Sequence, residues 1–228
     1  MLPADRSVFG VEAWGLHSRP PQEDFAAMAE EYAATVAASC DAPPVIIGWC
    51  FGGVMAFATA QALRRAGHEV VQLIIVNCAV PGDEEGPPRR SPPTTSSAAS
   101  PSTTSWTCRR GSSDTGNCSR PCRTSGGCPP DSGEAELRSL LDVYTANMTV
   151  MDRYFMQERT KLDRPDFPVL LVRAEPDDEP LDPDRTCGWG SVVGPDLGFA
   201  SVAANHHGIV RQPAVARLAE LIGRELDA

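Results

Sequence analysis

A stretch of 56 residues without a single large aliphatic side chain divides this 228-residue chain into two parts. Residues 81–136 contain no Leu, Ile, Val, Met or Phe, and Trp106 is their only aromatic residue. Such a segment buries too little apolar surface to offset the entropy that its backbone loses on ordering. We therefore predict that residues 81–136 are disordered, and that the folded core is built from residues 1–80 and 137–228.

The composition of the whole chain is that of a globular protein with an acidic balance. Hydrophobic residues make up 42%, and 20 basic against 30 acidic residues give a formal net charge of −10. This charge argues against nucleic acid or an anionic membrane as the main partner. No apolar run approaches the ~18 residues of a membrane span, and the first residues lack a secretory pattern. We expect a cytoplasmic protein whose eight cysteines are thiols.

The two flanks alternate short apolar runs with amphipathic segments. The apolar runs predict buried strands, and the segments with a 3.6-residue period predict helices. We expect strands at 45–49, 70–76 and 168–174, with another inside 7–15, and helices at 25–37, 53–66, 137–151 and 213–226. Gly67 is expected to stop the second helix. Strands that alternate with helices predict an α/β fold with a mostly parallel sheet and helices on both faces.

The strongest local signal is the sequence VIIGWCFGGV at residues 45–54. An apolar strand leads into Gly48-Trp49-Cys50-Phe51-Gly52, and a helix follows at once. This is the form of a nucleophile elbow, G-x-S-x-G, with cysteine in place of serine. Glycine on either side is expected because strand and helix approach closely there, and the helix N-terminus favours a thiolate at Cys50. The alternative is a buried cysteine in a glycine-rich turn.

A thiol nucleophile needs a base, and the chain has four histidines. His17 and His68 lie in polar, loop-like contexts. His206 and His207 follow a candidate strand and precede the last helix, which is where an elbow-type site places its base. We select His206 as the base; the alternative is a pair of solvated loop histidines.

Three stretches together give the chain a family resemblance. VFGVEAWGL, the region from GWCFGG to LIIVN and the late NHHGIVRQPAVARLAELI resemble the thioesterase domains of polyketide and nonribosomal peptide synthetases. The match covers about residues 7–78 and 137–226. The resemblance implies an α/β-hydrolase fold and an acyl or peptidyl substrate carried on the phosphopantetheine thiol of a carrier protein. It implies no cofactor or metal of the chain's own.

In that family a Ser, Asp and His act together, and the acid ends the strand after the elbow helix. The positions that match here are Cys50, Asn77 and His206, with His206 as general base and later general acid. A cysteine can already be a thiolate beside a protonated histidine, so the neutral amide of Asn77 is expected to suffice for orienting the ring. The backbone N–H of Phe51 is the expected oxyanion donor. The alternative orienting group is Asp177 or Asp178, after the strand at 168–174.

Two departures from the family bear on activity. The family's first strands, and the loop with the second oxyanion donor, lie upstream of the part that matches, so we expect a sheet without those strands. Residues 81–136 occupy the lid position, and a local shift of reading frame would explain their composition. The segment also contains four cysteines that raise the hypothesis of a zinc site: Cys108, Cys118, Cys122 and Cys128. This hypothesis is weaker, since only one pair of them is closely spaced.

The resulting expectation is a thioesterase that releases its chain by hydrolysis or cyclisation from a Cys50-bound acyl-enzyme. The alternatives are a truncated, non-catalytic remnant of the fold and a general esterase of the α/β-hydrolase type.

Overall fold

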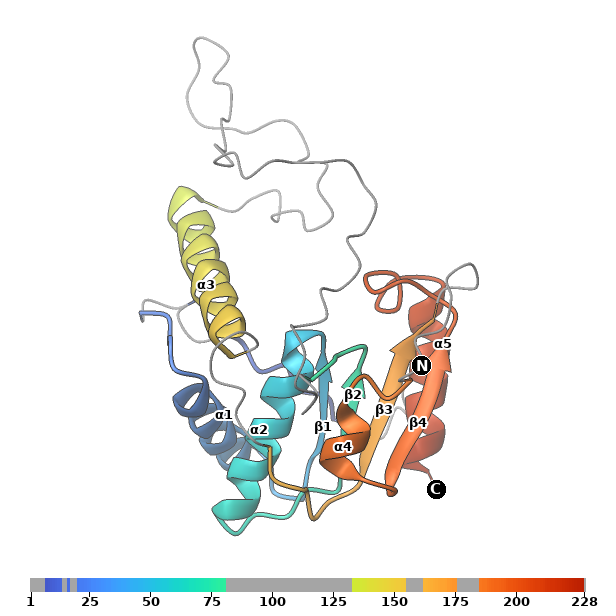
Figure 1. Cartoon of the computed structure of the whole chain (residues 1–228). Coiled ribbons are helices and arrows are strands. Elements are labelled where there is room, and N and C mark those ends of the chain that lie inside the picture. Colours follow the sequence, from blue (N-terminus) through green and yellow to red (C-terminus); the bar gives the residue numbers. More distant parts are fainter. Residues whose placement is uncertain are drawn as a thin grey trace.

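A computed structural model of the chain describes residues 7–13, 16, 20–80, 133–154, 162–175 and 185–227. Nine elements follow one another along it (Figure 1). The helices are α1 (Phe25–Ser39), α2 (Phe51–Arg65), α3 (Glu134–Arg153), α4 (Trp189–Val193) and α5 (Ala214–Leu226). The strands are β1 (Val45–Trp49), β2 (Gln72–Val76), β3 (Val169–Ala174) and β4 (Leu197–Val202).

The four strands form one parallel sheet in the order β1-β2-β3-β4. The side chains of β2 alternate between its two faces, as a strand period of two requires. Leu73 and Ile75 pack in the cluster that contains α2 and α4 residues, while Ile74 and Val76 pack in the cluster that contains α5 residues. All four are buried. The predicted α/β fold, with a parallel sheet and helices on both faces, is confirmed.

The helix ends follow local sequence signals. The carboxylate of Asp24 accepts a hydrogen bond of 2.7 Å from the N–H of Ala27, which caps the start of α1. At the end of α2, Gly67 has φ +86°, and the following N–H of His68 donates back to the carbonyl of Leu63. This is a Schellman motif, and it confirms that Gly67 stops the helix.

Helix α3 stands over the ends of α1 and α2 (Figure 1). Near its C-terminal end Val150 packs with Met28 and Met55, and the ring of Tyr154, just beyond it, stacks on that of Phe25 at 4.5 Å. The row of apolar side chains nearer its start is exposed instead: Leu137, Leu140, Leu141, Tyr144 and Met148.

Two expectations about elements need correction. Residues 7–13 form no strand, although the run at 7–15 is apolar. Val8, Phe9 and Val11 are at least half exposed there, so no burial of their side chains supports a strand. Helix α3 begins at Glu134 rather than Leu137, because alanine and glutamate extend a helix readily.

The predicted disorder concerned residues 81–136, of which 81–132 lie outside the described residues, as do all four cysteines of the zinc hypothesis.

Candidate active site

Cys50 occupies a sharp turn between the end of β1 and the start of α2. Its backbone has φ 56° and ψ −135°, a conformation that is strained for any residue with a side chain. Two hydrogen bonds hold it there: the N–H of Cys50 donates to the carbonyl of Val76 at 3.0 Å, and the N–H of Gly53 donates to the carbonyl of Cys50 at 2.8 Å. The strand, turn and helix expected of a nucleophile elbow therefore follow one another at this cysteine.

The glycines around Cys50 are not equivalent. A Cβ on Gly48 would overlap the carbonyl oxygen of Gly52 and lie 2.8 Å from the Cβ of Ala56. A Cβ on Gly52 would meet nothing within 4 Å. The expectation that both flanking glycines avoid a clash is thus right for Gly48 and wrong for Gly52. The second constrained position is Gly53, where a Cβ would lie 2.8 Å from that of Cys78.

Asn77 directly follows β2 and is also in the left-handed region, with φ 45°. Its side chain makes two contacts with residues that are distant in the sequence, so no local sequence pattern predicts them. The amide oxygen Oδ1 accepts a hydrogen bond of 3.0 Å from the backbone N–H of Ala174, at the end of β3. The amide nitrogen Nδ2 lies 2.6 Å from the ring nitrogen Nδ1 of His206. Asn77 therefore joins the ends of β2 and β3 to the loop that carries the histidine.

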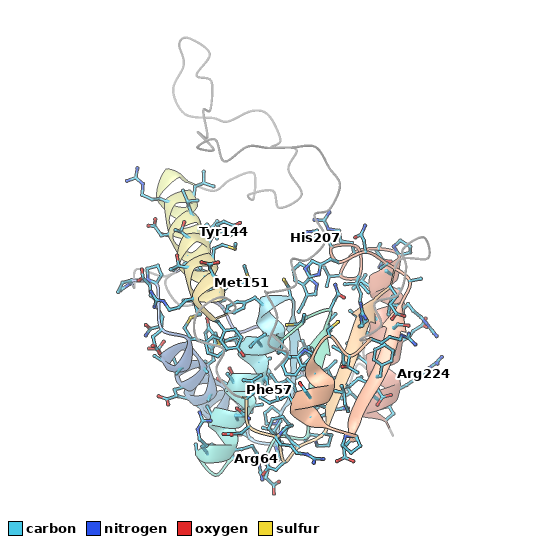
Figure 2. The ribbon with its side chains drawn as sticks, in the orientation of Figure 1. Phe57, Arg64, Tyr144, Met151, His207 and Arg224 are labelled. Atoms are coloured by element: carbon cyan, nitrogen blue, oxygen red, sulfur yellow. The ribbon has the colours of Figure 1, made fainter. Side chains whose placement is uncertain are left out.

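His206 lies in the loop between β4 and α5, half-buried beside the elbow. The indole ring of Trp49 stacks on its imidazole at 5.2 Å, and the indole N–H donates to the carbonyl of His206 at 3.3 Å. Within the loop, the side-chain oxygen of Asn205 accepts a 2.7 Å hydrogen bond from the N–H of Gly208. His207 is exposed at this end of the sheet (Figure 2), with its ring centroid 5.0 Å from that of His206.

The surroundings of His206 favour its neutral form. Burial lowers the pKa of the imidazole below its ordinary value of 6.5, and the neighbouring charge of His207 lowers it further. Burial raises the pKa of Cys78, the other cysteine close to the elbow, so that thiol stays protonated. The lowered pKa means that the imidazole of His206 stays uncharged near neutral pH. In that form it can act as a base or donate a hydrogen bond, depending on which ring nitrogen carries the hydrogen.

The predicted site residues are brought to one end of the sheet, although they are far apart in sequence. Cys50, Asn77 and His206 are linked through the Val76 carbonyl and the amide–imidazole contact, and Phe51 opens α2 directly after Cys50. Within the described residues no hydrogen bond joins Cys50 to His206 itself. Such bonds are often long in an enzyme without its substrate.

The alternative residues are placed differently or not at all. Asp177, Asp178 and His17 lie outside the described residues, and His68 is exposed in the turn after α2. The described carboxylate nearest to Asp177 and Asp178 in the sequence is Glu175. Both of its carboxylate oxygens accept hydrogen bonds from the guanidinium of Arg185. Burial alone would raise the pKa of Glu175, but the hydrogen bonds from Arg185 and Ser201 outweigh it and lower the pKa.

Sequence reasoning missed two participants. Trp49 is part of the elbow motif, and an aromatic residue before the nucleophile was a signal that it could cover the base. The N–H of Ala174 had no signal, because it is a backbone group brought to Asn77 by strand pairing.

Across the described part of the chain, no cluster of three His, Cys, Asp or Glu side chains could hold a metal ion, and no helix has the length and apolarity of a membrane span.

Comparison with known proteins matches the family described as "Thioesterase domain" to residues 1–225. The thioesterase TesA of Mycobacterium marinum (strain ATCC BAA-535 / M) is 37% identical over 65 residues, which are 28% of this chain and 26% of that protein. The chain thus matches only about a quarter of the length of that curated relative.

Solved structures share the fold at low sequence identity. A four-domain nonribosomal peptide synthetase, solved in its holo form with AMP and glycine, superposes with a TM-score of 0.62 at 20% identity, over 94% of this chain and 17% of that one. YbtT, a type II thioesterase from the yersiniabactin biosynthetic pathway, superposes with a TM-score of 0.55 at 17% identity, over 90% of this chain and 75% of YbtT. The NocB thioesterase domain superposes with a TM-score of 0.55 at 20% identity, over 93% of this chain and 78% of the NocB chain.

These findings define the class of protein: a member of a thioesterase family with an α/β-hydrolase fold. The chain belongs to the thioesterase domain family. Its structural relatives include a type II thioesterase from a nonribosomal peptide and polyketide biosynthetic pathway, and a thioesterase domain from the nocardicin cluster.

Proposed function

We propose that the chain transfers an acyl or peptidyl group from the phosphopantetheine thiol of a carrier protein to Cys50, in the cytoplasm, as a step in polyketide or nonribosomal peptide synthesis. Cys50 is the nucleophile, His206 its imidazole partner, Asn77 the residue that positions the ring, and the N–H of Phe51 the oxyanion donor. Release follows by hydrolysis, or by cyclisation when the chain carries its own nucleophile. YbtT, which by name comes from a nonribosomal peptide and polyketide biosynthetic pathway, and the match to a four-domain nonribosomal peptide synthetase support this choice of pathway.

The observation that carries the proposal is the strained turn at Cys50 beside the Asn77–His206 pair. A residue is held at φ 56° only where the surrounding structure enforces it, and such strain gathers at functional sites. The turn also sets Cys50 directly before the 15-residue helix α2. A structural cysteine would need neither feature.

The chemistry of the first step balances without a proton transfer. The thiolate of Cys50 attacks the thioester carbonyl carbon, the oxyanion accepts hydrogen bonds from backbone N–H groups, and the bond to the pantetheine sulfur breaks. Pantetheine leaves as a thiolate and takes its proton from solvent. One thioester replaces another, so the transfer is nearly neutral in energy.

The test is mass spectrometry of the chain after incubation with an acyl carrier protein loaded with a short acyl group. We expect one acyl adduct on Cys50 and none in Cys50→Ala. Cys40→Ala is the matched control, since Cys40 lies at the far end of α1 and its loss should leave the adduct intact. An adduct that persists in Cys50→Ala would refute the assignment of the nucleophile.

A further inference from the structure

The two hydrogen bonds of the Asn77 side chain fix which of its atoms faces His206. An amide oxygen and nitrogen are normally hard to tell apart, and their assignment follows from their partners. Here one partner is a backbone N–H, that of Ala174, which can only donate. Asn77 therefore directs Oδ1 to Ala174 and Nδ2 to His206. The flipped amide would set an NH2 group against the N–H of Ala174 and leave both donors without an acceptor.

The orientation of the amide in turn fixes the tautomer of His206. The Nδ2 of Asn77 carries two hydrogens and no acceptor lone pair, so at 2.6 Å it must donate to Nδ1 of the ring. Nδ1 is then unprotonated, and the neutral imidazole carries its hydrogen on Nε2. A general base of this kind needs the opposite arrangement, with Nδ1 protonated and Nε2 free to accept.

We propose that Asn77 holds His206 in the Nε2–H tautomer, so that the site exchanges acyl groups between thiols but releases them to water only slowly. This inference rests on the proposed function and narrows it. Asn77 acts through His206 and is a positioning residue.

The two halves of the reaction differ in their need for a base. Acylation is the attack of the Cys50 sulfur, as thiolate, on a thioester carbonyl, and this attack needs no group that accepts a proton. The reverse attack, by the thiolate of a free thiol on the Cys50 thioester, needs no base either. Attack by water requires a group that removes its proton, and Nε2 of this tautomer has no lone pair to do so.

An aspartate at position 77 would reverse the arrangement with little change of shape. One carboxylate oxygen would accept from Ala174 N–H as Oδ1 does now, and the other would accept from a protonated Nδ1. Aspartate also tolerates the left-handed backbone at this position about as well as asparagine. Asn77→Asp is therefore expected to move the hydrogen of the neutral ring to Nδ1 and leave Nε2 unprotonated, with a lone pair that can accept a proton.

The first measurement reads the tautomer directly. In protein labelled with 15N-histidine, an unprotonated ring nitrogen resonates far downfield of a protonated one, and His206→Gln identifies the signals. We expect Nδ1 of His206 to be the unprotonated nitrogen in the wild type and the protonated one in Asn77→Asp. A protonated Nδ1 in the neutral ring of the wild type would overturn the inference.

The second measurement follows the acyl-enzyme. Cys50 is loaded with butyryl-pantetheine, excess reagent is removed, and loss of the acyl group is followed in buffer alone and with free pantetheine. We expect slow loss to water and rapid loss to pantetheine in the wild type. Loss to water should rise by about 10²-fold or more in Asn77→Asp, the usual worth of a general base. Equal rates of hydrolysis in the two proteins would overturn the inference.

The matched control is Asn205→Asp. It adds the same charge one residue before His206, but its side-chain oxygen accepts from Gly208 N–H. It should leave both the tautomer and the rate of hydrolysis as in the wild type, whereas a rise equal to that of Asn77→Asp would assign the effect to charge alone. If Cys50 takes up no acyl group in any variant, the proposed function fails, and the nitrogen spectrum still decides the tautomer.

Discussion

Gly48 and Gly52 stand at equal distances from Cys50 in the sequence, but the fold requires only one of them to be glycine. The difference arises because α2 turns back over the end of β1, which places the carbonyl oxygen of Gly52 where a Cβ of Gly48 would stand. The side of Gly52 where a Cβ would stand faces open space. Sequence symmetry around the nucleophile therefore does not imply symmetry of the packing.

We expect Gly48→Ala to lower the free energy of unfolding by about 1–3 kcal/mol, as overpacking of a close contact does. Gly52→Ala is the matched control and should change it by less than about 1 kcal/mol, because the new methyl group meets nothing and alanine favours a helix. Urea denaturation of both variants measures the difference. Equal destabilisation would contradict the steric account of the elbow.

The ionisation of His206 depends on two causes that a single substitution separates. Burial is the larger cause of its lowered pKa, and the charge of His207 is the smaller. His207→Gln should raise the pKa of His206 but leave it below the ordinary 6.5. An NMR titration of the ring protons measures this, and a pKa at or above the ordinary value would show that His207 is the main cause.

The same lowered pKa has a consequence for stability. Below 6.5 the unfolded chain binds a proton at position 206 more readily than the folded one. The stability that depends on neutral His206 is therefore fully present above that pH, and it is lost as the pH falls through the lowered folded-state pKa. His207→Gln should raise the folded-state pKa toward 6.5, so the loss still begins near 6.5 but ends at a higher pH and is smaller in total.

At the scale of the elements, the tyrosine within helix α3 and the one at its C-terminal end lie in different environments. Tyr154, next to its C-terminal end, is 2% exposed and stacks on Phe25, whereas Tyr144 is 62% exposed. Figure 2 shows Tyr144 on the part of α3 that stands away from α1 and α2. The helix is thus attached to the core near one end, and the 3.6-residue period in its sequence does not distinguish the attached end from the exposed one.

We expect Tyr154→Ala to cost about 3–5 kcal/mol of stability, the usual cost of removing a buried aromatic ring. Tyr144→Ala, the same substitution within α3 itself, should stay within about 0.5 kcal/mol of the wild type. Thermal and urea unfolding measure both. A comparable loss in the two variants would mean that the exposed part of α3 contributes to the fold as much as its attached end.

At the scale of the whole molecule, two stretches separated by 81–132 build one sheet. The central pairing, Leu73↔Val169 through Val76↔Val172, joins β2 from one stretch to β3 from the other. The N–H of Val80 also donates to the carbonyl of Cys187, and the indole of Trp189 donates to the carbonyl of Cys78 at 2.9 Å. Strands and helices from both stretches are therefore parts of one core.

This joint core predicts that cutting the chain does not separate its halves. A protease site inserted after Ser100 and cleaved in the folded protein should leave two fragments that elute together on gel filtration, because the buried β2–β3 pairing does not depend on the peptide between them. Elution as two separate fragments would contradict a shared core. Addition of denaturant after cleavage is the control that the cut was complete.

Local patterns in the sequence were enough to predict most of the fold. The apolar run at 45–49 and Gly67 after α2 fixed a strand and a helix end, because strand burial and helix capping depend on neighbouring residues. The order of these elements then favoured a parallel sheet with helices on both faces. The run at 7–15 misled, because apolar residues mark a strand only when a sheet is there to bury them.

Only the tertiary structure decided how the site's atoms are paired. Asn77 and His206 are 129 positions apart, and the donor that orients Asn77 is a main-chain N–H of β3, which any residue at position 174 other than proline would present. A hydrogen-bond direction of this kind depends on which backbone groups strand pairing brings within 3 Å. The sequence, through its family resemblance, therefore predicted a cysteine, an amide and an imidazole at the end of the sheet. The pairing of β2 with β3 decided which atom of the amide the imidazole contacts, because it brings the N–H of Ala174 to the other one.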